Sequence, residues 1–228
     1  MKKMIIFLTS LPLIVTIIAI QYLPDQIPLH YNSAGEIDRW GSKYECFVFP
    51  IIIIIVSLIA NYIAKKIYHN SSINCDEKEK RKAMNNKQLM DLLFVVVLVI
   101  MNLDHYSTMY SSYIEATNNM INSYLDNDFW MLITMGIIII MLGYIIPKTD
   151  RNSIVGIRNK WTLSSDLVWK KSNQFSGYVL LITGILIIII DCFIKNARNI
   201  FFGIGALIIS ILICEIRSKY YYSVYKDS

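Results

Sequence analysis

Long uninterrupted apolar stretches are the feature of this sequence that most restricts what it can fold into. A helix needs about 20 mostly apolar residues to cross a hydrocarbon core of about 30 Å, because each residue advances roughly 1.5 Å. Six stretches meet this requirement, and we place them at residues 4–22, 46–64, 89–110, 129–146, 177–194 and 199–216. The chain is therefore expected to cross a membrane about six times.

These spans are expected to be helices. A backbone exposed to lipid must satisfy its own hydrogen bonds, and residues 51–56 lack the alternation of a barrel strand. Hydrophobic residues make up 55% of the chain, more than the near-half of an ordinary soluble domain, so a water-soluble core is not expected. The predicted fold class is all-α, a polytopic helical membrane protein of about six transmembrane helices.

The distribution of Lys and Arg predicts which side of the membrane each loop faces. Two precede the first span, seven lie in residues 65–87, six lie in 148–171 and three follow the last span. The intervening loops hold only Arg39, Lys43, Lys195 and Arg198. The positive-inside rule then predicts a protein of the cell membrane with both termini on the cytoplasmic side. The formal net charge of +5 thus comes from basic residues in the predicted cytoplasmic segments beside the lipid bilayer. No direct nucleic-acid partner is expected.

Two further readings concern the N-terminus and the cysteines. Lys2 and Lys3 before an apolar run could indicate a signal peptide, but no small-x-small cleavage site follows and the run is long, so a retained first span is expected. The cysteines Cys46, Cys75, Cys192 and Cys214 form no disulfide framework and are expected to be free thiols.

The loop at residues 23–45 is patterned like a small external β-hairpin. Ile27, Leu29 and Tyr31 alternate, and residues 32–35 supply turn residues that end on a glycine. Charges in the two predicted external loops sum to −2 over residues 23–45 and −3 over residues 113–128, which suits a cationic peptide. Residues 110–128 either extend the third span or lie along the interface. The candidate peptide contacts are Pro24, Pro28, His30, Gly35, Asp38, Trp40 and Lys43.

Four polar residues lie inside predicted spans: Asn102, Asp104, His105 and Asp191. Charge in lipid is costly, so these side chains are expected to face the bundle or water, either as interhelical hydrogen bonds or, with His30, Asp38 and Arg39, as an external vestibule. The sequence has no His-x-x-x-His or Glu-x-x-His spacing, no nucleophile elbow and no phosphate loop. We therefore expect no metal, no cofactor and no enzymatic activity.

The sequence suggests three segments: a two-helix unit at 1–66, a charged cytoplasmic linker at 67–88, and a four-helix module at 89–228 with a cytoplasmic loop at 147–176. In that loop Ser164 is a plausible N-cap for a short helix with Asp166 in its first turn. Trp161 and Trp169 are expected at the membrane surface. Arg158 either faces lipid phosphate, caps a carbonyl, or belongs to a docking surface whose net charge over 148–171 is +4.

The loop at 147–176 resembles the signature of the SdpI family. The matching residues are Pro147, Lys148, Asn152, Gly156, Ile157, Arg158, Trp161, Thr162, Leu163, Val168, Trp169 and Asn173. The Leu-Pro, Ile-Pro, His, Gly, Asp and Trp-Gly-Ser-Lys pattern of residues 23–43 resembles a small domain of unknown function that often precedes the SdpI module. Residues 46–129 match mainly as hydrophobic spans.

The resemblance implies a bacterial plasma-membrane protein that gives immunity to a secreted antimicrobial peptide. It also implies a receptor role, in which the toxin-bound protein holds a transcriptional repressor at the membrane. The alternative is a transporter or channel-like component, with Asp104, His105 and Asp191 lining a path. No inverted repeat or pair of broken helices supports that alternative.

Overall fold

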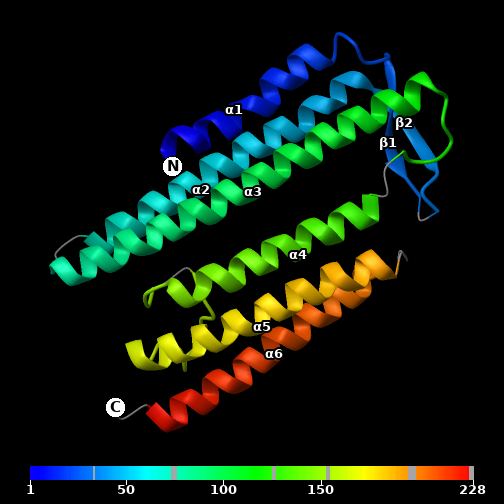
Figure 1. The fold of residues 1–228 in the computed structure, drawn as a ribbon. Coiled ribbons are helices and arrows are strands. Elements are labelled where there is room, and N and C mark those ends of the chain that lie inside the picture. Colours follow the sequence, from blue (N-terminus) through cyan, green and yellow to red (C-terminus); the bar gives the residue numbers. More distant parts are fainter. Residues whose placement is uncertain (33, 73–75, 125–126, 153–154, 195–198, 226–228) are drawn as a thin grey trace. The chain divides into compact units, whose positions relative to one another are not determined.

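The computed structural model describes residues 1–32, 34–72, 76–124, 127–152, 155–194 and 199–225. Its long helices are α1 (Lys2–Ala19), α2 (Val48–Ser72), α3 (Glu77–Thr117), α4 (Asn127–Ile145), α5 (Asp166–Phe193) and α6 (Asn199–Tyr225) (Figure 1). Two short 3-10 helices, η1 (Lys43–Phe47) and η2 (Ile146–Lys148), adjoin α2 and α4. The strands β1 (Gln26–Tyr31) and β2 (Ile37–Ser42) follow α1.

The described residues contain six helices that are long and apolar enough to cross a membrane, as the sequence predicts. Large apolar side chains along them stay exposed, including Phe7 at 58% and Phe201 at 74%. Such surfaces are stable in lipid and costly in water. The chain is therefore a multi-pass membrane protein, and the predicted all-α fold class is confirmed.

Four helices extend well beyond the predicted spans, and one of them is α2, which continues to Ser72. The helix α3 begins at Glu77 and ends at Thr117, so it includes the mixed-charge run that the sequence analysis assigned to a linker. Glu and Lys are good helix formers, and the acids Glu77 and Glu79 lie in the first turn, where they favour the helix dipole. The helix α5 is continuous from Asp166, and α6 continues to Tyr225.

The chain divides into two compact units, which we describe separately. Unit 1 consists of residues Met1–Asn61 and Phe94–Trp130, and unit 2 consists of residues Tyr62–Leu93 and Met131–Ser228. Unit 1 thus combines α1, the strands and the start of α2 with the second half of α3. Unit 2 contains the first half of α3, most of α4, and α5 and α6.

The strands of unit 1 form the predicted antiparallel hairpin. Gln26 pairs with Ser42 and Tyr31 with Ile37, with irregular register around His30. The turn closes through Asn32, whose Oδ1 accepts from the N–H of Ala34 at 2.9 Å, and through Gly35 at φ +77°. The segment after α3 adds a further pairing, because Ile37 N–H donates to Ile121 O at 2.8 Å.

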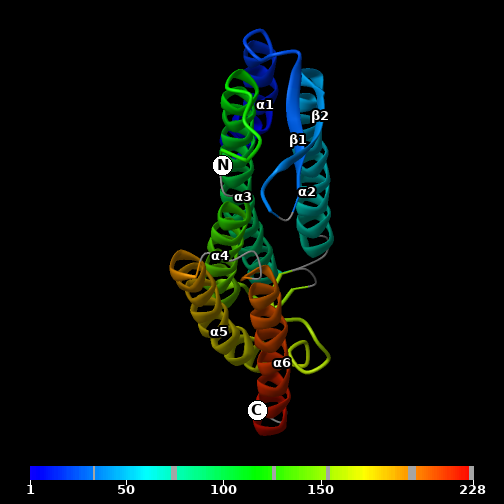
Figure 2. The same ribbon diagram turned by 90° about the vertical axis from the view of Figure 1, so that its right-hand side faces the viewer.

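Unit 2 is built on close contact between α4 and α5. Its core cluster contains Leu132, Ile139, Ile146, Val155, Leu180 and Ile187. Gly136 lies against Gly184, and Gly143 lies against Gly177, each pair placing the backbone of one helix against that of the other. The helices α5 and α6 also lie side by side (Figure 2), joined by a 2.6 Å hydrogen bond between the Thr183 and Ser210 hydroxyls. Small residues at such crossings let membrane helices pack closely.

Candidate functional site

The signature loop, residues 147–176, is organised around two buried side chains of α5. Trp169 is 1% exposed, and its indole Nε1–H donates to Thr149 O at 2.9 Å. Asn173 is fully buried, and its Oδ1 accepts from Ile157 N–H at 2.7 Å. These two bonds attach both halves of the loop to the first turns of α5. The expectation that Trp169 lies at the membrane surface is wrong, because this indole fills the interior of unit 2.

Gly156 is required by the same packing. Its φ is +124°, which L side chains rarely adopt. A Cβ there would lie 2.7 Å from Trp169 Cζ2 and 2.8 Å from Asn173 Oδ1, too close for any side chain. Gly156, Trp169 and Asn173, which all belong to the signature described in the sequence analysis, therefore pack against one another.

A second turn in the loop is built by Asn159. Its Oδ1 accepts from Trp161 N–H at 3.0 Å and from Thr162 N–H at 2.8 Å, and Thr162 is fully buried. The Asn159 amide also donates to Glu215 Oε2 at 2.6 Å and to Ser218 Oγ at 2.7 Å on α6. The sequence analysis missed Asn159, although the Asn-x-x-Thr spacing is typical of a side-chain-bonded turn.

The helix α5 begins one residue later than the sequence suggests. Ser165, and not Ser164, is the N-cap, with its Oγ accepting from Val168 N–H at 3.2 Å. The Ser164 hydroxyl instead donates to Trp161 O at 2.6 Å. Asp166 does lie in the first turn, as predicted. The predicted short helix is wrong, because α5 runs unbroken through Gly177 to Phe193.

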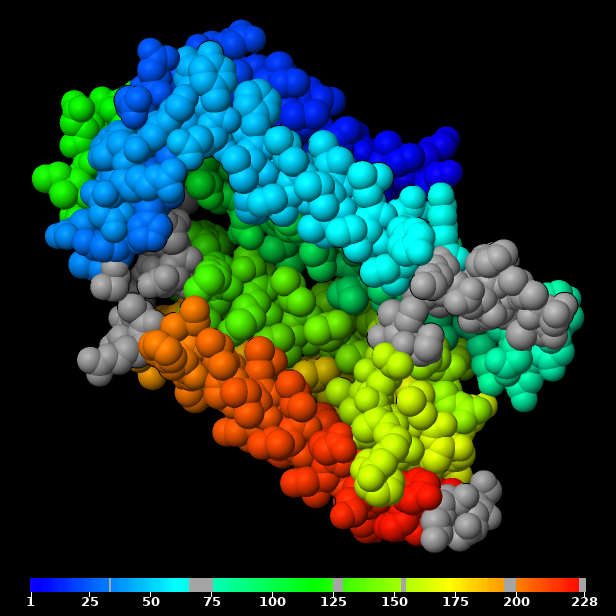
Figure 3. Space-filling model, turned by 180° about the vertical axis from the view of Figure 1, so that it is seen from behind, coloured from blue at the N-terminus to red at the C-terminus, as the bar shows by residue number. Residues whose placement is uncertain are grey.

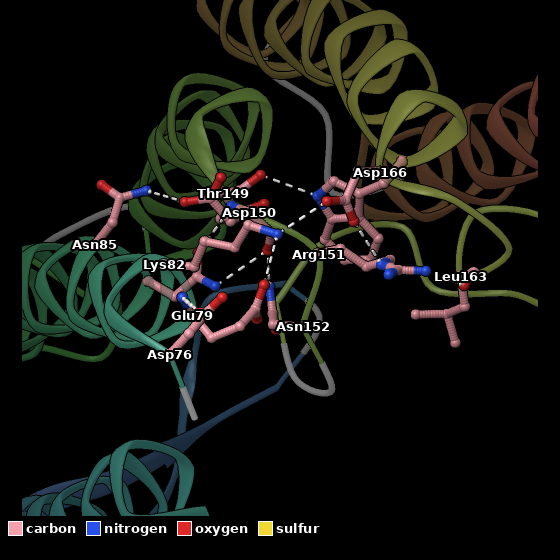
Figure 4. Close-up of polar contacts among 12 residues, drawn as sticks. Asp76, Glu79, Lys82, Asn85, Thr149, Asp150, Arg151, Asn152, Leu163 and Asp166 are labelled. Atoms are coloured by element: carbon pink, nitrogen blue, oxygen red, sulfur yellow. Dashed lines mark hydrogen bonds and ion pairs between the residues drawn. The ribbon is translucent and has the colours of Figure 1, made fainter. Parts of the chain in front are cut away.

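The first turns of α3 bind the signature loop through the polar contacts that Figure 4 shows. Lys82 Nζ lies 2.8 Å from Asp166 Oδ2, and Arg151 Nε lies 2.8 Å from Asp166 Oδ1. Asn86, only 5% exposed, donates to Asp150 O at 3.1 Å and accepts from Asp150 N–H at 2.9 Å. The sequence analysis assigned this charged segment to a linker and did not identify Lys82 and Asn86 as contacts of the loop.

The remaining signature residues have varied roles. Asn152 Oδ1 accepts from Val155 N–H at 2.7 Å, and Pro147 packs against Gly177. Lys148 Nζ lies over the Tyr144 ring, 2.9 Å from its centroid. Arg158 is exposed and makes no hydrogen bond or ion pair within the described ranges, and Leu163 is 39% exposed. The outward-facing part of the loop therefore includes Arg158 and Leu163.

The hairpin of unit 1 holds the candidate residues of the first loop. His30 Nδ1 lies 2.6 Å from Asp38 Oδ1, and Lys43 Nζ lies 3.0 Å from Asp25 Oδ1. Pro28 pairs with Trp40 across the strands, and Trp40 is 43% exposed. Gly35 forms the turn, and Pro24 is half-buried. These residues therefore share one small structure, although their functional role stays a prediction.

Glu115 anchors the hairpin to α3, a role that the sequence analysis missed. It is fully buried, accepting from Tyr31 OH at 2.7 Å, Ser111 Oγ at 2.6 Å and Tyr124 N–H at 2.6 Å. Burial, and next the hydrogen bond to Glu115, raise the pKa of Tyr31 well above its ordinary value. Glu115 was counted among the external charges, but this carboxylate is not available to a ligand. Asp126 and the Asp128 side chain lie outside what the structure describes.

Two of the four intramembrane polar residues join helices in unit 1. The Asn102 amide donates to Leu8 O on α1 at 3.0 Å. His105 Nε2 lies 2.7 Å from the Thr16 hydroxyl, and its ring stacks on Phe49 of α2. Asp104 is half-buried beside them, and Asp191 is a buried residue of unit 2. The contacts of Asn102 and His105 are interhelical hydrogen bonds of the kind that the sequence left open.

No contact in the described residues joins the His30 and Asp38 pair to Asn102, Asp104 or His105. The described residues also contain no cluster of three or more potential metal-ligating side chains. Cys46, Cys192 and Cys214 are free thiols, as expected, and Cys75 lies outside the described residues.

Unit 1 also contains an apolar groove of about 340 Å³ between α1 and α3. Its lining combines aliphatic side chains with four tyrosines: Val15, Ala19, Tyr22, Leu23, Tyr106, Met109, Tyr110 and Tyr113. The groove lies at the end of α1 from which the chain enters the hairpin. Its lining suits an apolar side chain of a ligand better than a polar group.

Comparison with known proteins gives matches in both halves of the sequence. Residues 148–216 match the SdpI/YfhL protein family, and residues 7–54 match a domain of unknown function, DUF1648. The chain is 25% identical over 224 residues to a Bacillus subtilis (strain 168) protein named Immunity protein SdpI, and the alignment covers 97% of each chain. No solved structure matches this chain. The resemblance drawn from the signature loop and the first loop is confirmed.

Proposed function

We propose that this membrane protein, which carries the SdpI-family segment, protects its cell against a secreted peptide toxin. The observation that carries the proposal is the similarity to Immunity protein SdpI, which extends over 97% of both chains. The matched family segment, residues 148–216, includes most of the signature loop, whose buried Trp169 and Asn173 give it a defined structure. We propose a non-enzymatic mechanism, in which the protein acts by binding.

The proposed peptide site is the groove of unit 1 together with the hairpin. Its tyrosine-rich lining would accept apolar side chains of an amphipathic peptide. Asp25, which directly precedes the hairpin and is 92% exposed, and Asp38, which is 42% exposed, are paired with Lys43 and His30. They still contribute to the net charge of −2 over residues 23–45, which can attract a cationic peptide. Glu115 plays no part in this attraction because it is buried.

A survival assay tests the immunity proposal. The gene is expressed in a sensitive bacterial host, which is then exposed to the small secreted peptides encoded beside it. Wild-type protein should raise the inhibitory concentration of one of them. If no such peptide becomes less toxic, the immunity proposal fails.

A pair of α1 variants tests the location of the site. Ala19→Phe places a ring in the groove, whereas Ile18→Phe adds the same ring at a neighbouring side chain that is 54% exposed. Protection should be lost with Ala19→Phe and kept with Ile18→Phe at equal membrane abundance. If wild type and both variants protect equally, immunity stands and the groove is not the binding site.

We also propose that the signature loop docks a cytoplasmic transcriptional repressor. Its exposed residues include the cation of Arg158 and the apolar side chain of Leu163, and the net charge of +4 over residues 148–171 suits an acidic partner. Affinity capture from toxin-treated cells should recover a repressor with wild-type protein and much less with Arg158→Ala or Leu163→Ala. Undiminished recovery with both variants would exclude docking at this face.

This arrangement requires the hairpin and the signature loop to face opposite sides of the membrane, with both termini in the cytoplasm. Single cysteines at Asp38 and at Lys160, in a chain whose four native cysteines are serines, test this. A membrane-impermeant maleimide added to intact cells should label the Asp38→Cys protein and not the Lys160→Cys protein. Labelling of both positions from outside would contradict the topology.

The transporter alternative gains no support from the described contacts. His105, one of the three residues expected to line a path, is closed off by the Thr16 hydroxyl and the Phe49 ring. Unchanged ion or solute flux in Asp104→Asn and Asp191→Asn proteins is the result expected for an immunity protein.

A further inference from the structure

Lys160 and Lys219 lie against the same aromatic ring. Lys160 Nζ is 4.4 Å from the centroid of the Trp161 ring, and Lys219 Nζ is 6.0 Å from it. The Tyr222 ring packs beside this indole, with the two centroids 5.0 Å apart. The distances from the two lysine nitrogens to the indole are both within the range at which an ammonium group is attracted to the face of an indole. Two positive charges are thus concentrated around one half-exposed tryptophan.

Neither of these cations is paired with a carboxylate within the part of the chain that the structure describes. The lysine and arginine side chains that form ion pairs in unit 2 are Lys82, Lys87 and Arg151, within the described residues. Lys160 and Lys219 form no ion pair among the residues described. The charged carboxylate of Glu215 lies one turn before Lys219 on α6 and accepts from the Asn159 amide, but it forms no ion pair with either lysine among the described residues. The two ammonium groups therefore keep hydrogen-bond capacity and charge for an anion from outside the chain.

The position of this cluster fits the surface of a membrane. Lys219 and Tyr222 belong to the last turns of α6, directly after an apolar run that includes the exposed side chains of Ile213 and Ile216. Figure 3 shows the loop segment that precedes α5 lying against the end of α6. Aromatic rings and lysines at the end of a membrane helix normally occupy the headgroup layer.

We propose that Lys160, Trp161 and Lys219 form a binding site for the phosphate of an anionic phospholipid headgroup. The two ammonium groups would contact the phosphate, and the indole and the Tyr222 ring would pack on the glycerol and the upper acyl chains. Charge complementarity selects an anionic lipid over a zwitterionic one. The site is independent of the proposed immunity function. It would attach the signature loop to the membrane leaflet at the C-terminal end of α6.

Fluorescence quenching tests this site in full-length protein reconstituted in phosphatidylcholine nanodiscs. Brominated phosphatidylglycerol quenches tryptophan on contact, and the Trp161→Phe protein measures the quenching that comes from the other tryptophans. The Trp161 component should be half-quenched at a lower mole fraction of brominated phosphatidylglycerol than of brominated phosphatidylcholine. Lys160→Gln/Lys219→Gln should reduce this preference about 5-fold or more, as expected for removing lysines at an anionic surface.

Matched variants decide between a site and diffuse charge. Lys170→Gln/Lys171→Gln removes the same charge from exposed positions in the first turns of α5. It should change the preference for brominated phosphatidylglycerol by less than about 2-fold. Lys160→Arg/Lys219→Arg should retain the preference. An equal loss in both glutamine pairs would overturn the proposal in favour of general surface charge. Displacement of the brominated lipid by millimolar inorganic phosphate would overturn it in favour of a free-anion site.

Discussion

Replacing Gly184 with alanine should push α4 and α5 apart. A Cβ at Gly184 would lie 2.7 Å from the backbone oxygen of Gly136 and 2.7 Å from Ile140 Cγ1. Neither contact can be relieved by a flexible side chain, because the first involves backbone and the second a branched residue in the same crossing. The helices must separate, and overpacking of this kind costs about 1–3 kcal/mol.

Gly205→Ala on α6 is the matched control, because a Cβ at that position meets no atom within 4 Å. Both substitutions replace a helical glycine with alanine, which favours the helix by about 1 kcal/mol. The helix-propensity gain cancels when the two variants are compared. The free energy of unfolding of Gly184→Ala should therefore be lower than that of Gly205→Ala by about 1–3 kcal/mol.

Unfolding by SDS in mixed micelles, followed by tryptophan fluorescence, measures this difference. The double variant Gly136→Ala/Gly184→Ala gives a further check, because the two residues share one contact and their effects should not add. Equal unfolding free energies for Gly184→Ala and Gly205→Ala would refute the argument that the glycine contact sets the α4 and α5 distance.

Three other expectations concern hydrogen bonds. Asn86→Ala removes both bonds to the Asp150 backbone, so unit 2 should lose about 1–3 kcal/mol and the signature loop should exchange its amide hydrogens faster. Glu115→Ala leaves three donors without their acceptor, so stability should fall by about 2 kcal/mol or more and hydrogen exchange should rise across the hairpin. The raised pKa of Tyr31 means that its stabilising contribution is complete below its ordinary pKa near 10 and is lost as pH rises from there towards the folded pKa. The stability difference between wild type and Tyr31→Phe should accordingly be constant from pH 7 to 9 and shrink at pH 11, and a constant difference at all pH values would contradict this sign.

The sequence identified the spans and the hairpin because both depend on local patterns. Transfer of a helix into lipid is favourable in proportion to its own apolar residues, whatever its neighbours are. The hairpin follows from alternating residues and from a turn that needs Gly35 at positive φ. The signature loop was recognisable because several of its residues, such as Gly156, admit no substitute in their contacts.

The predictions for Trp169 and for the N-cap of α5 were wrong because the same residue type fits two environments. An indole at the end of a helix suits the membrane surface and a protein interior equally, so Trp169 and Trp161 look alike in sequence. The structure separates them, because Trp169 donates to Thr149 O inside unit 2 while Trp161 stays half-exposed beside Tyr222. Ser164 and Ser165 are likewise equivalent as N-caps until the path of the loop decides between them.

The sequence by itself determined that this chain lives in a membrane, because lipid selects long apolar helices one segment at a time. Tertiary structure alone decided which polar groups are buried and what they bind. Glu115 meets Tyr31 across 84 residues of sequence, and Asn86 meets Asp150 across 64. A hydrogen bond depends on the position of both partners to within a few tenths of an ångström, and no local pattern in the chain records that position.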